Sequence, residues 1–193
     1  MRFDDGLYTW VTDLAHRAPG PLDTLISVWS DYGLALFAVL MVLAWWRARP
    51  LGVARVSMAL AAPLVVVAAY VVNDVFKMAV HEQRPCQTLH TLTVEACPPL
   101  GDWSFPSNHA AIAAAAAVAV LLTDRVLGAL AVPAALLMGA SRVWIGAHYP
   151  HDVVIGLLVG AAVSVVLAPV ARRAAPFVER LCDTRLRPLV STR

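Results

Sequence analysis

Residues with chemically useful side chains gather in the stretch SRVWIGAHYPHD (residues 141–152), which lies between two long apolar runs. It contains Arg142, His148 and Asp152. A charged side chain at membrane depth is costly, and such residues usually mark a functional site. We therefore expect this stretch to belong to a functional site rather than to a simple connection.

The spacing of His148 and Asp152 suggests a paired role. Pro150 is suited to the first turn of a helix, so Asp152 lies in that turn and His148 just before it. A carboxylate placed there can accept a hydrogen bond from one imidazole nitrogen and leave the other with a basic lone pair, as in activated nucleophiles. We expect His151 to point elsewhere on the turn, as an interfacial bystander.

A second polar stretch, KMAVHEQRP (residues 77–85), follows a long apolar run. Lys77 and Arg84 are seven residues apart, which is about two turns of a helix, so the spacing predicts that they share one helix face. Together they would form a cationic site. The alternative is that each side chain simply extends to the lipid headgroups.

A third stretch, FPSNHA (residues 105–110), opens another apolar run. Ser107 is suited to cap a helix, and the unpaired N–H groups of a helix start attract anions such as phosphate. His109 in the first turn could then donate a proton. The alternative is an ordinary cap followed by an interfacial histidine.

The three stretches together favour phosphoryl transfer. This reaction needs cations for the phosphoryl oxygens, an in-line nucleophile and an acid for the leaving oxygen. Lys77, Arg84 and Arg142 would supply the cations, and the two histidines would supply the nucleophile and the acid. Three nearby cations would oppose a divalent metal, and the usual metal-ligand spacings are missing. We expect no metal and no cofactor.

The rest of the chain predicts a membrane scaffold. It has 193 residues, of which 60% are hydrophobic and 15% charged, whereas soluble domains are about half apolar and a quarter charged. A soluble bundle is disfavoured because the apolar runs lack a polar face. We expect one all-α, membrane-embedded domain over residues 1–193, with about five to six helices. The predicted spans are 22–46, 53–80, 108–123, 126–144 and 150–170.

The first residues differ from these spans. Apolar side chains from Phe3 to Leu14 recur at helical spacing opposite acidic residues, which predicts an amphipathic helix in the membrane interface. The loops after the first and third spans and the C-terminal tail hold most of the arginines. By the positive-inside rule these lie in the cytoplasm, so the three polar stretches face outward. The scattered arginines do not resemble a nucleic-acid-binding surface.

The cysteines are consistent with this sidedness. Cys86 and Cys97 both fall in the outward loop, where a disulfide could persist. Cys182 falls in the cytoplasmic tail. The sequence leaves open whether Cys86 and Cys97 are bonded or are two free thiols.

The three stretches resemble the signature motifs of the type 2 phosphatidic acid phosphatase (PAP2) superfamily of lipid phosphatases. The shared pattern is Lys, six residues, Arg-Pro, then Pro-Ser-x-His, then Ser-Arg, five residues, His, three residues, Asp. All three motifs are present in order within residues 77–152 (77–85, 106–109 and 141–152). More loosely, the chain also resembles the small bacterial undecaprenyl-diphosphatases of this superfamily.

The resemblance implies a helical bundle, metal-free catalysis and a role for each motif residue. His148 would be the nucleophile that forms a phosphohistidine, Asp152 would orient it, and His109 would protonate the leaving group and then activate water. The implied phosphate-binding residues are Lys77, Arg84, Ser107, Asn108 and Arg142. Asn108 stands where the motif often has glycine, and because asparagine suits a helix start we expect activity to survive.

An outward site fits a lipid phosphate that finishes its work outside the cell. We expect a bacterial plasma-membrane enzyme that hydrolyses a polyprenyl diphosphate, such as undecaprenyl diphosphate. Phosphatidate, phosphatidylglycerophosphate and other prenyl-linked phosphates are alternatives. A soluble-substrate relative is disfavoured by the spans, a non-catalytic binding or flipping protein by the intact histidines, and a transporter by clusters at one membrane face.

Overall fold

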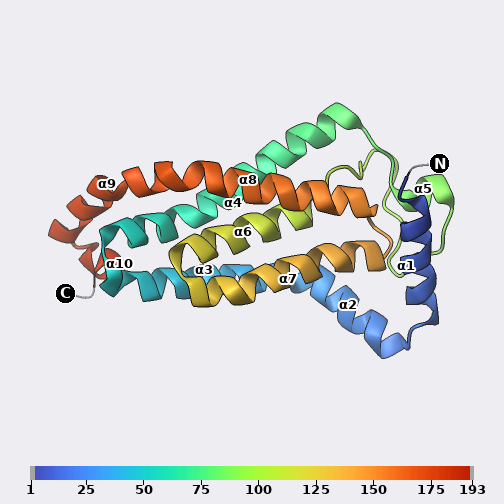
Figure 1. Cartoon of the computed structure of the whole chain (residues 1–193), viewed down its shortest axis with the longest axis horizontal. Coiled ribbons are helices and arrows are strands. Elements are labelled where there is room, and N and C mark those ends of the chain that lie inside the picture. The colour runs from blue at the N-terminus through green and yellow to red at the C-terminus, as the bar shows by residue number, and fades with distance from the viewer. Residues whose placement is uncertain (1–2, 192–193) are drawn as a thin grey trace.

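The protein is a bundle of helices in which α6 occupies the centre (Figure 1). The computed structural model describes residues 3–191, and within this range every regular element is helical. The helices are α1 (Asp5–Arg17), α2 (Gly20–Tyr32), α3 (Leu34–Ala48), α4 (Val53–Val80), α5 (Pro85–Leu89), α6 (Asn108–Thr123), α7 (Arg125–Trp144), α8 (Pro150–Arg173), α9 (Ala175–Glu179) and α10 (Arg187–Val190), with 3-10 turns at Arg49–Leu51 and Arg180–Asp183. The predicted all-α fold class is confirmed.

The predicted spans agree with the structure except for the first. The second and third coincide with α4 and α6, and the fourth and fifth with α7 and α8, to within three residues at either end. The first predicted span, 22–46, is wrong as a single helix because it is divided at Gly33 into α2 and α3. A Cβ atom at Gly33 would lie 2.4 Å from the Trp29 carbonyl oxygen and 2.7 Å from the end of Met138, so close packing requires glycine there.

Four helical segments are long and apolar enough to cross a membrane: those that contain α3, α4, α7 and α8. The remaining predicted span, α6, has only 16 residues, most of which are buried. It runs between α4 and α8 on one side and α3 and α7 on the other (Figure 1). A helix of this length rises about 24 Å, so it lies inside the bundle without needing to reach both surfaces.

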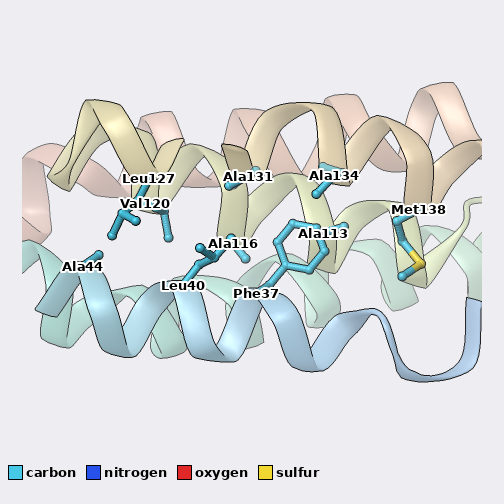
Figure 2. Packing of buried hydrophobic residues seen from close by; sticks show 12 residues of the cluster. Phe37, Leu40, Ala44, Ala113, Ala116, Val120, Leu127, Ala131, Ala134 and Met138 are labelled. Carbon is cyan, nitrogen blue, oxygen red and sulfur yellow. The ribbon is translucent and has the colours of Figure 1, made fainter. Parts of the chain in front are cut away.

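The main core is formed by α3, α6 and α7 (Figure 2). Phe37 and Leu40 of α3 and Met138 of α7 pack around the alanine-rich surface of α6. Small residues allow helices to approach closely, which is how helices associate where lipid supplies no hydrophobic driving force. The alanine-rich sequence of α6 is therefore explained by its central position.

The contact between α6 and α8 is close enough to require glycine. A Cβ atom on Gly156 would lie 2.5 Å from the Ser107 carbonyl oxygen, and one on Gly160 would lie 2.1 Å from that of Ala111. The Ser164 hydroxyl donates a hydrogen bond to the Ala115 carbonyl, at 2.8 Å, further along the same contact. This packing holds the N-terminal turns of α6 and α8 side by side.

The amphipathic helix α1 lies across one end of the bundle (Figure 1). Its Tyr8, Thr12 and Ala15 side chains are buried against the protein, and its large apolar side chains Leu7, Trp10 and Leu14 are exposed. An exposed apolar face of this kind suits insertion into the membrane interface.

The C-terminal tail packs at the opposite end of the bundle (Figure 1). Val190 is buried among residues of α3 and α4, and the Trp45 indole donates a hydrogen bond to the Leu189 carbonyl at 2.8 Å. Asp124 caps α7, because its side chain accepts hydrogen bonds from the backbone N–H groups of Val126 and Leu127. Its carboxylate also lies 2.5 Å from the Arg47 guanidinium.

Candidate active site

The predicted site residues meet at the end of the bundle that α1 covers. Six of them line one cavity of about 270 Å³: Lys77, Arg84, Asn108, His109, Arg142 and His148. They come from α4, the connection after it, the first turn of α6, the last turn of α7 and the connection to α8. Ser107 and Asp152 are fully buried beside this cavity.

His148 is held by Asp152 as its spacing predicts. Its Nδ1 lies 3.3 Å from Asp152 Oδ2, and the same oxygen accepts a hydrogen bond from the Tyr149 N–H at 2.9 Å. The other ring nitrogen, Nε2, lies 3.4 Å from Arg84 Nη1, a donor. A proton on Nδ1 and a lone pair on Nε2 satisfy both contacts, so the basic nitrogen lies beside Arg84, which lines the cavity.

The environment of His148 favours its neutral form. Burial lowers the pKa of its imidazole well below the usual 6.5, and the nearby charges of Arg84, Arg142 and Lys77 lower it further. A histidine that stays neutral keeps the lone pair that nucleophilic attack requires. The cations that line the cavity with His148 therefore also favour its neutral form.

Arg84 does not share a helix face with Lys77, and this prediction is wrong. Helix α4 ends at Val80, because His81 adopts the left-handed conformation with φ 52°. Arg84 follows in extended backbone before α5. Its guanidinium forms two hydrogen bonds with the Asp102 carboxylate, at 3.0 and 3.1 Å, and one with the Ala147 carbonyl at 2.8 Å.

Lys77 and Arg142 keep donors available to the cavity. The Lys77 ammonium donates one hydrogen bond, to the Trp103 carbonyl at 3.0 Å, which leaves two of its three N–H groups. Arg142 donates to the Ser30 hydroxyl, and its buried Nε has no partner among the described residues. Both side chains are at most 9% exposed, so each is a buried cation that suits an anionic ligand.

The first turn of α6 contributes backbone and side-chain groups. Ser107 occupies the N-cap position, but its hydroxyl makes no capping hydrogen bond and is buried with no partner among residues 3–191. Asn108 Oδ1 accepts a hydrogen bond from Asn73 of α4 at 2.7 Å. His109 lines the cavity, and neither ring nitrogen has a hydrogen-bond partner in the described part of the chain. The helix start is thus open toward the cavity.

A disulfide closes the wall of the cavity. Cys86 and Cys97 are joined, with an S–S distance of 1.99 Å, and both line the cavity. Cys182, at the opposite end, is free. Of the two alternatives that the sequence left open for Cys86 and Cys97, the structure has the bonded form.

The sequence did not point to several polar residues of the site. Ser104 donates a hydrogen bond to Asp152 and lies 3.4 Å from His148 Nδ1. Glu95 lines the cavity, and burial raises the pKa of its carboxyl although Arg142 acts in the opposite direction. The others are Ser30, Asn73 and Asp102. They lie outside the three motifs, and only their proximity to a motif residue in the fold reveals them.

His151, which we expected to be an interfacial bystander, contacts three carboxylates. Its Nδ1 lies 2.8 Å from Asp4 Oδ2, and its Nε2 lies 3.1 Å from Glu82 Oε1 and 3.3 Å from Asp152 Oδ1. The side chain is 16% exposed. His151 therefore connects three segments of the chain directly behind the His148–Asp152 pair.

The arrangement combines buried cations and an imidazole whose environment favours the neutral form around one cavity. Such a site can bind a phosphoryl group and attack its phosphorus. A second histidine, His109, faces the same cavity and can exchange a proton with a leaving oxygen or with water.

Comparison with known proteins gives the class to which this fold and site belong. Residues 58–175 match the PAP2 superfamily. The chain therefore belongs to the PAP2 superfamily and is a phosphatase, a hydrolase of phosphoric ester or anhydride bonds.

Individual relatives narrow the comparison. The chain is 31% identical over 160 residues to the undecaprenyl-diphosphatase BcrC of Bacillus subtilis, which covers 82% of this chain and 79% of the relative. It is 33% identical over 150 residues to an undecaprenyl-diphosphatase of Sulfolobus acidocaldarius, and this match covers 74% of this chain and 68% of the relative. The crystal structure of Aquifex aeolicus LpxE has a similar fold, with a TM-score of 0.68 at 21% identity, over 86% of this chain and 94% of that one.

Proposed function

We propose that the chain is a single-domain membrane phosphatase that hydrolyses a polyprenyl diphosphate, with undecaprenyl diphosphate as the favoured substrate. It would release inorganic phosphate and leave the lipid monophosphate. The observation that carries the proposal is the position of His148, which is held by Asp152 and lines one cavity with Lys77 and Arg142. The two relatives named as undecaprenyl-diphosphatases support this choice of substrate.

In the proposed reaction the terminal phosphate binds to Lys77, Arg142 and the N–H groups at the start of α6. His148 Nε2 attacks the terminal phosphorus, and the bond from that phosphorus to the bridging oxygen breaks. His109 gives a proton to the departing lipid monophosphate. Water then attacks the phosphohistidine while His109 takes its proton, which releases phosphate and restores His148.

Arg84 would contribute in two ways. Its hydrogen bonds to Asp102 and Ala147 occupy much of the guanidinium, so it fixes the backbone just before His148. Its charge adds to the potential that attracts phosphate. Ser107 and Asn108 would position the start of α6 beside the bound phosphate.

We further propose that the site faces outward from a bacterial plasma membrane and that the C-terminus is cytoplasmic. Arg47, Arg55, Arg125 and Arg172 all line a second cavity at the end opposite the site, which the positive-inside rule assigns to the cytoplasm. The lipid chain would lie among the helices in the bilayer, with its headgroup at the interface. No nucleic acid is expected as a partner.

A phosphate-release assay tests the function. The purified protein in detergent, with EDTA and no added metal, is given undecaprenyl diphosphate, phosphatidate and phosphatidylglycerophosphate in parallel, and kcat/KM is compared. We expect release with EDTA present and the highest kcat/KM for the diphosphate. No release from any lipid would overturn the phosphatase assignment of this site, and preference for a glycerolipid would overturn the polyprenyl substrate.

A further inference from the structure

His151 lies where three segments of the chain meet. Its backbone N–H and its Nδ1 both contact Asp4 Oδ2, at 2.9 and 2.8 Å, ahead of α1. Its Nε2 contacts Glu82 in the connection after α4, at 3.1 Å, and Asp152 in its own helix, at 3.3 Å. One side chain thus joins the N-terminal segment, the connection that leads to Arg84, and the carboxylate that holds His148.

Aromatic rings enclose the imidazole. It stacks on Tyr149 with ring centroids 5.4 Å apart and an interplanar angle of 19°. Phe3 and Phe105 lie 5.6 and 5.8 Å from it. The imidazole packed among these rings is 16% exposed.

The carboxylates around His151 indicate a protonated ring. A neutral imidazole has one N–H, but here both nitrogens face carboxylates, so only the imidazolium can donate to each. Glu82, His151 and Asp152 offer ligand atoms within 4.8 Å of one another, a grouping that could also hold a metal ion. Because both ring nitrogens are already engaged with carboxylates, the imidazolium itself supplies the cation in this grouping.

The two oxygens of Asp152 have different partners. Oδ2 faces His148, the Tyr149 N–H and the Ser104 hydroxyl. Oδ1 has no hydrogen-bond partner among the described residues and lies 3.3 Å from His151 Nε2. His151 therefore attracts one oxygen of the carboxylate while the other holds the nucleophile.

We propose that His151 is a positioning residue that fastens α1 and the α4–α5 connection to Asp152 and so fixes the orientation of His148. This role rests on the proposed phosphatase function. It also gives α1 a purpose beyond membrane contact. The Tyr8 hydroxyl of α1 donates a hydrogen bond to the Gly146 carbonyl at 3.0 Å, two residues before His148. The N-terminal segment therefore contacts residues on both sides of His148, through Tyr8 with Gly146 and through Asp4 with His151.

Steady-state kinetics of His151→Asn test the proposal, with His90→Asn as the matched control. His90 is exposed directly after α5 and is not among the residues that line the cavity, and its left-handed backbone (φ 51°) accepts asparagine. We expect kcat of the His151 variant to fall about tenfold, equivalent to about 1.4 kcal/mol, with KM within about twofold of wild type. The His90 variant should match wild type.

A double-variant cycle distinguishes loss of the His151–Asp4 contact from general destabilisation. Asp4→Asn should lower kcat in the same direction, and the His151→Asn/Asp4→Asn pair should lose no more than the His151 variant alone, because both changes break one linkage. Additive losses of kcat would contradict a shared His151–Asp4 contact. Unchanged kcat in the His151 variant, or a rise in KM alone, would overturn the positioning role.

Amide hydrogen exchange supplies a readout that does not depend on turnover. In His151→Asn, residues 5–17 should exchange faster than in wild type while α6 and α7 keep their protection. Unchanged exchange in α1 would contradict the linkage, and restoration of kcat in wild type by a divalent cation after EDTA treatment would assign the grouping to a metal. A wild-type protein that releases no phosphate would overturn the proposed function itself, and exchange would still decide whether the linkage exists.

Discussion

The two ends of the bundle use arginine differently. Arg84 and Arg142 at the site end are 6% and 8% exposed and are held by named partners. Four arginines at the opposite end are exposed and line a wider cavity of about 1020 Å³: Arg47, Arg55, Arg125 and Arg172. A buried cation requires an anionic partner because desolvation is costly, whereas an exposed one satisfies the positive-inside rule without further contacts. In this chain burial, more than residue type, distinguishes the arginines of the candidate site from those at the opposite end of the bundle.

The largest effect that tests this comparison is expected at Arg142. Arg142→Lys keeps the charge but loses the planar fork that matches phosphate, and we expect kcat/KM to fall about 100-fold, the size of losing one transition-state donor. Arg125→Lys is the matched control at the other end and should stay within about twofold of wild type. Equal losses in the two variants, measured by phosphate release, would remove the distinction between the ends.

The next largest effect is expected from removal of the disulfide. This bond crosslinks the chain at the site end, whereas Cys182 at the other end is free. Replacing both Cys86 and Cys97 by serine opens a loop of 11 residues' separation, and a loop of this length is worth about 3 kcal/mol of stability in the chain-entropy model. We expect a lower thermal midpoint in detergent and reduced kcat/KM. Cys182→Ser should alter neither; a midpoint unchanged by the double replacement would show that the connection is held by its other contacts.

The pH dependence of kcat/KM should reveal the burial of His148. Burial first, and then the charges of Arg84, Arg142 and Lys77, hold its pKa well below 6.5. His148, the proposed nucleophile, therefore stays neutral as pH falls through 6.5 and is protonated only at lower pH, so the acid limb should lie below 6.5. Arg84→Gln removes one of these charges and should move the limb upward. A wild-type limb at or above 6.5 would contradict this environment for His148.

The smallest effect is expected at the end of the bundle opposite the site. Asp124 is partly shielded, which acts to raise its pKa, but hydrogen bonds from the Leu127 N–H and Arg47 lower it overall. Its contribution to stability is therefore present above pH 3.8 and is lost as pH falls through its lowered pKa. Asp124→Ala should cost about 1 kcal/mol of unfolding free energy at neutral pH and leave kcat unchanged. A loss of turnover at constant stability would show that this end participates in catalysis.

The sequence predicted most of the scaffold because long apolar runs determine membrane helices directly. The limits of α4, α6, α7 and α8 follow from where those runs stop. The break at Gly33 could not be predicted, since it depends on Trp29 and on Met138, which is more than 100 residues away. The second span was correctly ended at Val80, but the left-handed conformation of His81 was not predicted, so the helix face was wrongly extended to Arg84.

The site was predictable where the spacing of residues within one motif determines which side chains meet. The His148–Asp152 contact follows from a spacing of four across a helix start. Ser104, Asp102 and Asp4 could not be found in this way, since each reaches its partner only after a long connection folds back. The contacts of His151 could not be predicted either, because two of its three carboxylate partners, Asp4 and Glu82, come from distant segments.

The most direct test of the account is to trap the covalent intermediate. Wild-type protein is mixed with polyprenyl diphosphate labelled in its terminal phosphate, denatured within one turnover, and digested for mass spectrometry under alkaline conditions that preserve phosphohistidine. We predict label on His148, no label and no turnover in His148→Ala, and label that persists longer in His109→Ala because water is no longer activated. Label on another residue, or full turnover by His148→Ala, would contradict the account.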